Sequence, residues 1–174
     1  MPIDGCCRSF EELARTVLPA HMMRLRANML SPLALADFAV KGVGPATMRR
    51  RLGLEKDPPG CYVLIDHGKP VYVGISKHVL TRLIEHVRGT DHFTATLVYR
   101  IAKSRHPHGK TAADAMSDKE FRTRFEEARA HLLGMHAAFV EIENPLELYI
   151  FEAYCAMELD TGFDVGGWNT FETH

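Results

Sequence analysis

The chain has 174 residues, of which 46% are hydrophobic and 25% charged, and its formal net charge at pH 7 is −1. This length suits one main domain with an appendage and allows a real hydrophobic core. Four cysteines without a CxxC pair argue against a disulfide framework or a zinc site, and the lack of a long apolar run or a signal peptide leads us to expect a cytoplasmic protein without membrane contact.

The charge is unevenly divided along the chain. Residues 1–110 carry 17 Lys and Arg against 9 Asp and Glu, whereas residues 111–174 carry 4 against 13. A basic part is what a nucleic-acid surface needs, because positive charge attracts phosphates. Such asymmetry is also common among helical segments, so it supports DNA binding only together with other signals.

A helical extension is predicted for residues 1–57. The three expected helices cover residues 9–18, 20–30 and 33–40. Ser9 and Glu12 form a capping-box pattern at the start of the first helix, and Pro19 is expected to interrupt the chain before the second.

A glycine-containing turn follows these helices and precedes a basic run. Residues 41–47 read KGVGPAT and resemble a helix-hairpin-helix element, in which backbone N–H groups at a helix N-terminus meet a DNA phosphate. A helix end followed by an ordinary loop would explain the glycines as well. The candidate DNA contacts here are Gly42, Gly44, Arg49, Arg50 and Arg51.

A β-hairpin is predicted from Gly60 to Gly74, which read GCYVLIDHGKPVYVG. Both strands are rich in strand-forming residues, and the turn between them contains Gly68, which tolerates a positive φ. The two strands would place Tyr62 and Tyr72 side by side. Tyrosines in a hairpin are more often packing residues than functional ones, so alone they assign no function.

A helix is predicted over residues 79–87, because apolar residues recur there at helical spacing. Arg82 and His86 lie four residues apart and share a face outside the apolar stripe. An arginine can hold two phosphate oxygens in its planar fork, so this pair is a candidate phosphate receptor beside the tyrosines. An ordinary solvated face is the alternative reading. Lys77, just before this helix, is a further candidate DNA contact.

The segment after this helix is predicted to be mostly helical. Residues 91–102 are interpreted as a helix that packs on the sheet, although their threonines leave a strand open. Residues 118–133 are interpreted as an amphipathic charged helix. The apolar side of this helix is formed by Phe121, Phe125, Ala128 and Leu132.

A polar loop is predicted at residues 104–110, between those two helices. Arg105 and Lys110 in this loop are candidate DNA contacts, since a basic loop suits a phosphate surface. The two histidines of the loop are spaced too loosely to indicate a metal site. Residues 137–142 form the third predicted strand.

The last predicted helix begins at Asn144, where Asn144, Pro145 and Glu147 form a capping pattern. Glu152 lies in the middle of this largely apolar helix. A carboxylate in that setting is exposed on a polar stripe, is paired, or binds a metal ion. The residues alone leave a surface role and a functional role equally open. A glycine-rich segment follows and ends at Asn169.

Taken together, these residues resemble the GIY-YIG nuclease family. Gly60-Cys61-Tyr62 and Tyr72-Val73-Gly74 are similar to the two halves of its signature, with Cys61 where the family usually has isoleucine. The family has an arginine about ten residues after the second tyrosine, a histidine one turn later, a glutamate on a later helix and an asparagine after it. Those positions are matched by Arg82, His86, Glu152 and Asn169.

The resemblance implies a metal-dependent DNA endonuclease that hydrolyses phosphodiester bonds. Glu152 would hold one divalent ion, Mg²⁺ or Mn²⁺, because a hard cation prefers carboxylate oxygen. Arg82 would hold the phosphate, and Tyr62 would be the general base. Tyr72 and His86 would position the water or relay the proton, with His86 as the alternative base. Asn169 completes the implied catalytic set.

The implied fold is α/β, with a small three-stranded, mostly antiparallel sheet flanked by helices. The nuclease-like domain would span residues 58–174, with an inserted helical segment around residues 103–134. DNA is the implied partner, and a homodimer would present two sites to a duplex. The leading expectation is a restriction, genome-defence or DNA-processing enzyme. The alternative is a catalytically inactive DNA-binding module or the nuclease subunit of a larger complex.

Overall fold

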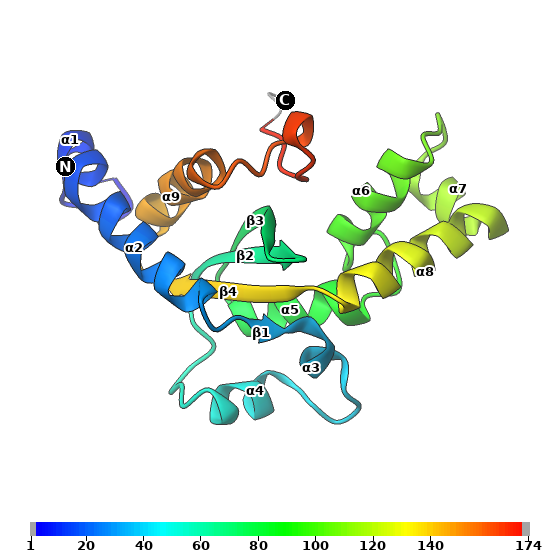
Figure 1. The fold of residues 1–174 in the computed structure, drawn as a ribbon, viewed down its shortest axis with the longest axis horizontal. Coiled ribbons are helices and arrows are strands. Elements are labelled where there is room, and N and C mark those ends of the chain that lie inside the picture. Colours follow the sequence, from blue (N-terminus) through cyan, green and yellow to red (C-terminus); the bar gives the residue numbers. More distant parts are fainter. Residues whose placement is uncertain (1–2, 172–174) are drawn as a thin grey trace. The chain divides into compact units, whose positions relative to one another are not determined.

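The structure is a computed structural model, and it describes residues 3–171 (Figure 1). The chain folds into two compact units. The first comprises the residues up to Leu33, Lys56–Val79 and the residues from His136 onward, and the second comprises Ala34–Glu55 and Leu80–Met135. The predicted site residues of the first unit are Tyr62, Tyr72, Glu152 and Asn169, and those of the second are Arg82 and His86.

The first unit contains the N-terminal helices, most of the sheet and the last helix. Its elements are α1 (Phe10–Glu12), the π-helical turn η1 (Leu13–Val17), α2 (Leu18–Met29), β2 (Gly60–Asp66), β3 (Lys69–Ser76), β4 (His136–Glu141), α9 (Pro145–Glu158) and the 3-10 turn η2 (Phe163–Val165). The second unit contains α3 (Leu35–Ala39), α4 (Pro45–Arg51), α6 (Thr96–Arg105), α7 (Ala112–Ser117) and α8 (Lys119–Leu133). Two elements cross the unit boundaries in sequence, β1 (Leu33–Ala34) and α5 (Val79–Arg88).

The sheet has four strands in the order β1-β4-β2-β3, so the prediction of three strands was wrong by one. The predicted α/β class is confirmed, and β2 pairs antiparallel with both β3 and β4. The additional strand, β1, occupies two residues that were predicted to start the helix over 33–40. A two-residue strand carries no alternation that a sequence can reveal, because it forms only where another strand offers its edge.

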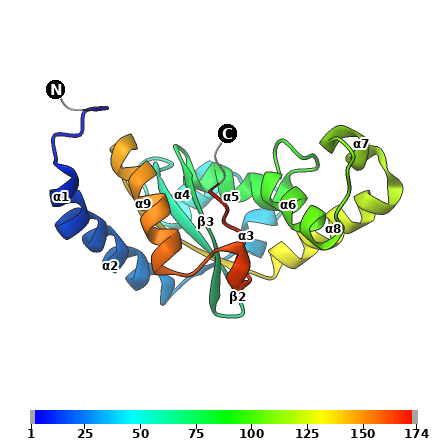
Figure 2. The ribbon, with the colours of Figure 1, turned by 90° about the horizontal axis from the view of Figure 1, so that it is seen from above.

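One face of the sheet forms the core of the first unit. Cys61, Val63 and Ile65 of β2 pack with residues of β3 and β4 against the helices. Helices α2 and α9 lie side by side on this core face (Figures 1 and 2). Successive strand residues alternate between the two faces, so Tyr62 and Leu64 project from the opposite face.

The N-terminal helix continues through Pro19, so the predicted interruption was wrong. Ser9 caps its start as predicted, and the Ser9 hydroxyl accepts a hydrogen bond from the Glu12 N–H at 3.2 Å. In η1 the Leu18 N–H bonds to the Leu13 carbonyl, five residues back. This wider turn shifts the hydrogen-bond register just before the proline, and the helix therefore tolerates the missing N–H.

In the second unit, α8 matches its prediction closely, and its buried residues are the four expected on the apolar side. Helix α6 was expected to begin at Asp91 but begins at Thr96. The Asp91 side chain accepts hydrogen bonds from the N–H groups of Phe93 and Thr94, at 2.9 and 2.8 Å. Such a side-chain turn competes with helix formation, which delays the start of α6.

Candidate active site

Both glycines of the hairpin signature are required by the space around them. Tyr62 faces Gly74 across the β2–β3 ladder. A Cβ atom on Gly74 would lie 2.5 Å from the hydroxyl oxygen of Tyr62 and 2.6 Å from its ring carbon Cζ. A Cβ atom on Gly60 would lie 2.2 Å from the carbonyl oxygen of Val140, on β4. The hairpin therefore holds the Tyr62 phenol directly over the backbone of Gly74.

Tyr62 and Tyr72 lie side by side, as the hairpin predicted. Their ring centroids are 6.2 Å apart and their planes are tilted by 50°. Ring pairs at this separation attract each other, so packing explains part of their placement. Only 1% of Tyr62 is exposed, whereas Tyr72 is half-buried. Tyr72 is therefore the phenol of this pair that solvent reaches more easily.

Asn169 is buried, and both polar atoms of its side chain form hydrogen bonds with the backbone of Val73. Its Oδ1 accepts a hydrogen bond from the Val73 N–H at 2.7 Å, and its Nδ2 donates to the Val73 carbonyl at 2.8 Å. The neighbouring Trp168 N–H donates to the Val71 carbonyl at 2.8 Å. The segment after α9 thus extends the outer edge of β3, and Asn169 positions the strand between Tyr72 and Gly74.

Replacing Asn169 by alanine should lower the free energy of unfolding by about 1–3 kcal/mol, because Val73 would keep a buried N–H and C=O without partners. Thermal unfolding followed by circular dichroism measures this loss. Asn28→Ala is the matched control, since exposed Asn28 donates one hydrogen bond of 2.8 Å to the Phe139 carbonyl. Its loss should cost less than about 1 kcal/mol. Equal losses in the two variants would contradict the buried role of Asn169.

Glu152 is half-buried on α9 and has no polar partner among residues 3–171. The helix begins as predicted, with the Asn144 side chain accepting a hydrogen bond from the Glu147 N–H at 3.1 Å. Burial raises the pKa of the Glu152 carboxyl above its usual range, and no hydrogen bond or positive charge offsets this effect. Ionising Glu152 in the folded chain therefore costs more free energy than ionising a glutamate in water.

For a divalent ion, the described surroundings of Glu152 would supply one carboxylate ligand. A bound cation would offset the cost of keeping its carboxylate ionised and half-buried. Within residues 3–171, no group of three or more His, Cys, Asp and Glu side chains could hold an ion together. Mg²⁺ keeps several water ligands and needs only one or two carboxylates, so a single glutamate fits Mg²⁺ better than Zn²⁺.

Cys61 and Cys155 belong to the core of the first unit, and Glu152 is near enough to influence Cys61. Both thiols are free and buried. Burial, then Cys155, and then the Glu152 carboxylate raise the pKa of the Cys61 thiol well above its usual range. A thiol in this state stays protonated and unreactive, so Cys61 serves as a small apolar residue where the GIY-YIG pattern usually has isoleucine.

The two phenols and Glu152 approach the hairpin from opposite sides. Helix α9 packs on the core face of the sheet, and its Glu152 is close enough to affect the Cys61 thiol on that face. Tyr62 and Tyr72 project from the other face, because their strand neighbours point into the core. Strand β3 is at the end of the sheet order, and its outer edge on both sides of Tyr72 is covered by Trp168 and Asn169.

In the second unit, the guanidinium of Arg82 is held in a defined position. Its Nη1 donates to Oε2 of Glu85 at 2.9 Å and to the Thr94 carbonyl at 3.2 Å, and its Nη2 donates to the Thr96 hydroxyl at 2.8 Å. Glu85 and the segment before α6 were not identified from the sequence as partners of Arg82. The pair with Glu85 is partly exposed, and a phosphate can compete with such a pair because exposed ion pairs are weak.

His86 is fully buried in the described structure. Burial, and then the positive charge of Arg82, lowers the pKa of His86 to about 3. The imidazole is therefore neutral at pH 7 and is a weak proton acceptor. A general base works best with a pKa near the working pH, so these surroundings do not favour His86 as the base.

The predicted helix-hairpin-helix element folds as two short helices, α3 and α4, joined by a turn. Gly42 in this turn has a φ of +82°, a conformation that favours glycine. Gly44 precedes the first residue of α4. Arg49 donates a hydrogen bond of 2.8 Å to the Glu55 carbonyl and so holds the loop after α4. The exposed arginines of α4 are Arg50 and Arg51.

Arg88 is a structural residue of this turn that the sequence did not reveal. Its Nη2 donates to the carbonyl oxygens of Val40 and Val43, at 2.6 and 2.5 Å. The Val43 N–H bonds back to the Val40 carbonyl at 3.0 Å, and the Arg88 guanidinium thus holds the turn that contains Gly42. No local pattern pointed to Arg88, because its partners lie 45 and 48 residues away in the chain.

The remaining candidate DNA contacts lie on the surface of their own units. Lys77 is exposed after β3, and Arg105 is exposed at the end of α6. Lys110 forms an ion pair with Asp118, and the hydrogen bond from Lys110 to this carboxylate raises the pKa of Lys110. The charge of Lys110 is therefore partly offset, whereas Lys77 and Arg105 have exposed cationic groups.

No family model matches this chain, and neither a curated protein nor a solved structure matches it. Among the helices formed by residues 3–171, none has both the length and the apolar character that crossing a membrane requires.

Proposed function

We propose that this chain is a GIY-YIG-type endonuclease that hydrolyses phosphodiester bonds of DNA with Mg²⁺ or Mn²⁺. The observation that carries the proposal is the half-buried carboxylate of Glu152, which lacks a polar partner among residues 3–171 and lies on the helix that packs against the tyrosine hairpin. A carboxylate that only supported the fold would be paired or exposed. Binding of DNA alone gives no reason for such a carboxylate, because it would repel the phosphate.

The roles of the polar side chains follow from the chemistry of phosphodiester hydrolysis. Glu152 would hold the divalent ion, and the ion would supply positive charge to the phosphate and its leaving oxygen. Arg82 holds the phosphate through its planar fork, and Glu85, Thr94 and Thr96 set the orientation of that fork. Asn169 acts through the backbone of β3 and is a positioning residue.

The proton of the attacking water goes to Tyr62 in this proposal. His86 is the weaker candidate, because its pKa is lowered to about 3. A free phenol has a pKa of about 10, so Tyr62 needs a nearby positive charge to lose its own proton and act as a phenolate base near neutral pH. Tyr72, which is less buried than Tyr62, orients the water or relays its proton.

Each unit, taken by itself, carries basic side chains that we propose as DNA contacts. In the second unit these are the arginines beside the glycine turn and Arg105, and in the first unit Lys77 is exposed. Contacts of this kind provide affinity without sequence information. A restriction, genome-defence or DNA-processing role remains part of this proposal, and so does a homodimer that cuts both strands.

The purified protein should nick supercoiled plasmid DNA in the presence of Mg²⁺, and EDTA should stop the reaction. Adding Mg²⁺ in excess of EDTA should restore nicking, because Glu152 alone gives a site from which the ion exchanges readily. Agarose gel electrophoresis measures the conversion of supercoiled to open-circular plasmid. A Glu152→Gln protein purified in parallel distinguishes this activity from that of a contaminating nuclease. Plasmid binding without any nicking would instead support the inactive DNA-binding module.

A further inference from the structure

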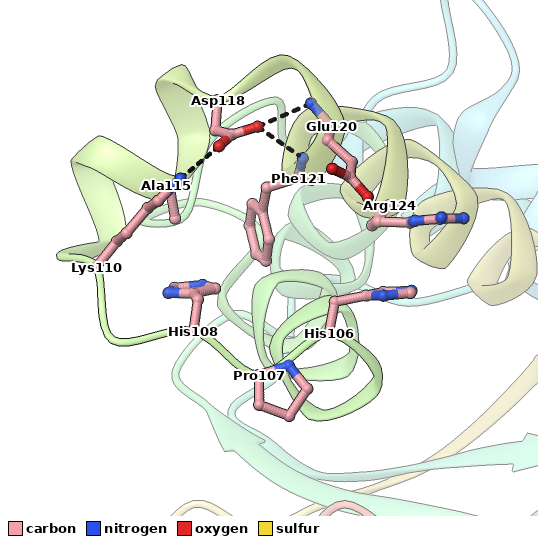
Figure 3. A pocket seen from close by; sticks show the side chains of 9 residues that line it. All are labelled: His106, Pro107, His108, Lys110, Ala115, Asp118, Glu120, Phe121 and Arg124. Atoms are coloured by element: carbon pink, nitrogen blue, oxygen red, sulfur yellow. Dashed lines mark hydrogen bonds and ion pairs between the residues drawn. The ribbon is translucent and has the colours of Figure 1, made fainter.

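A pocket in the second unit lies between the end of α6, the following loop and the start of α8 (Figure 3). Its volume is about 170 Å³, and its lining combines aromatic with charged side chains. Pockets for drug-sized ligands are larger, at about 300–1,000 Å³. The size of this pocket therefore suits a single flat ring system better than a large cofactor.

The pocket has an aromatic wall. The rings of His108 and Phe121 meet edge to face, with centroids 4.7 Å apart and planes at 88°. In Figure 3 the Phe121 ring points toward the two histidines of the loop, His106 and His108. Tyr99 packs against this wall, and its ring centroid lies 5.4 Å from that of Phe121 and 6.2 Å from that of His108. Aromatic walls of this kind bind nucleobases by stacking.

Two nitrogen atoms of the pocket lining are buried without a hydrogen-bond partner. They are Nδ1 of His108 and Nε of Arg124. Most buried polar atoms in folded proteins have a partner, so an exception calls for an explanation. A bound molecule would supply an acceptor atom to Arg124 Nε and, according to the tautomer of His108, an acceptor or a donor to its Nδ1. Nucleobases carry both kinds of atom.

The charged side chains at the pocket form ion pairs that a ligand can replace. Lys110 pairs with Asp118, and Asp118 also accepts hydrogen bonds from the N–H groups of Glu120 and Phe121 (Figure 3). Arg124 pairs with Glu127 at 3.2 Å. The Lys110 and Arg124 side chains are 52% and 36% exposed, and ion pairs this exposed are weak enough for a phosphate to displace.

We propose that this pocket binds one unstacked base of a nucleic-acid strand, with a flanking phosphate at Lys110 and Arg124. The choice of ligand rests on the proposed nuclease function. The base stacks against the His106, His108 and Phe121 wall. The carboxylate of Glu120, which also lines the pocket, accepts a hydrogen bond from an exocyclic amino group. Adenine, cytosine and guanine carry such a group and thymine does not, so thymine is the base that the pocket disfavours.

Nuclear magnetic resonance of the histidine side chains in the full-length protein tests this proposal. Titration with dAMP should shift the His106 and His108 signals to saturation, deoxyadenosine should shift the same signals, and dTMP should bind about tenfold more weakly. Inorganic phosphate that shifted these signals as strongly as dAMP would overturn base recognition in favour of an anion site. The absence of any shift with dAMP would overturn the proposal that this pocket binds a nucleotide.

Two variants test whether dAMP binds in the pocket rather than elsewhere on the surface. His108→Leu keeps an apolar contact with Phe121 and should weaken dAMP binding about tenfold or more, since stacking of a base is worth about 1–3 kcal/mol. His106→Ala, at an exposed position, should weaken binding even if His108→Leu fails to fold. His67→Ala is the matched control, because the His67 side chain is 93% exposed in the hairpin turn of the first unit. Unchanged dAMP binding by His106→Ala and a folded His108→Leu would contradict the proposal.

The nucleotide titration needs no Mg²⁺ and no cleavage, so its outcome is independent of the nuclease assay. Saturable dAMP binding by a protein that never nicks plasmid would overturn the nuclease function and support the pocket. Plasmid nicking by a protein that does not bind dAMP would overturn base binding in the pocket and leave the nuclease function standing.

Discussion

A Glu152→Gln protein should still bind DNA and should cut it roughly 10³-fold more slowly, because the loss of a stabilising charge at the phosphate has effects of this order. Glutamine keeps the shape of the side chain and removes the negative charge that holds a hard cation. Plasmid nicking measures the rate, and a gel-shift assay measures binding. Equal nicking by the wild type and Glu152→Gln would refute the assignment of Glu152 and, with it, the proposed reaction.

Glu158→Gln is the matched control for this variant. Glu158 lies on the same helix, is exposed and pairs with Arg26 at 3.3 Å. Its replacement removes the same charge from α9 and should leave nicking unchanged. Loss of activity in both variants would mean that the overall charge of α9, rather than a metal ligand at Glu152, supports cleavage.

The stability of Glu152→Gln should change with pH in a defined direction. Burial raises the pKa of Glu152 above its ordinary value of 4.5, so the folded chain binds a proton at pH values where the unfolded chain has released it. The contribution of this group to stability is therefore complete below the unfolded pKa and is lost as pH rises through the folded pKa. At pH 7 the variant should melt at a higher temperature than the wild type.

This difference in melting temperature should disappear in acid, below the usual pKa of a glutamate. Mg²⁺ at pH 7 should raise the melting temperature of the wild type and not that of Glu152→Gln, because only a ligand bound to the folded state stabilises it. Differential scanning fluorimetry with and without Mg²⁺ measures both effects. A variant no more stable than the wild type at pH 7 would show that water or another group already compensates the carboxylate.

Gly74→Ala should lower the free energy of unfolding by about 1–3 kcal/mol, as overpacking of a filled space does. The added Cβ would lie 2.5 Å from the Tyr62 hydroxyl oxygen, so either the phenol or the strand must move. Such a displacement at a reacting group should slow cleavage by roughly 10²-fold, since misplacement by about 1 Å has this effect. Thermal unfolding and plasmid nicking measure the two losses.

The clash with Tyr62 can be isolated by a double-mutant cycle. In a Tyr62→Ala background the ring is absent, so Gly74→Ala should cost no further stability. Gly109→Ala is the control for alanine itself, because a Cβ there meets nothing within 4 Å. An equal cost of Gly74→Ala with and without the Tyr62 ring would contradict the contact between them.

Much of the local structure was predictable because it depends on residues close together in the chain. The caps at Ser9 and Asn144 formed as expected, and so did the apolar side of α8. The predictions that were wrong concerned residues whose partners lie far away in the chain, or segments in which a turn competes with a helix. The strand β1 depends on β4, the helix passes Pro19 through a π-turn, and the Asp91 side chain holds a turn in place of the first residues of a helix.

The sequence by itself determined the hairpin, the pairing of its two tyrosines and the capped helix that carries Glu152, because spacing and turn chemistry decide such features. Only the tertiary structure decided that Gly74 lies under the Tyr62 ring and that Asn169 bonds to Val73. It also decided that Glu152 is half-buried and has a raised pKa. Burial and hydrogen bonding depend on segments far apart in the chain, so the chemical state of these side chains arises only when the chain has folded.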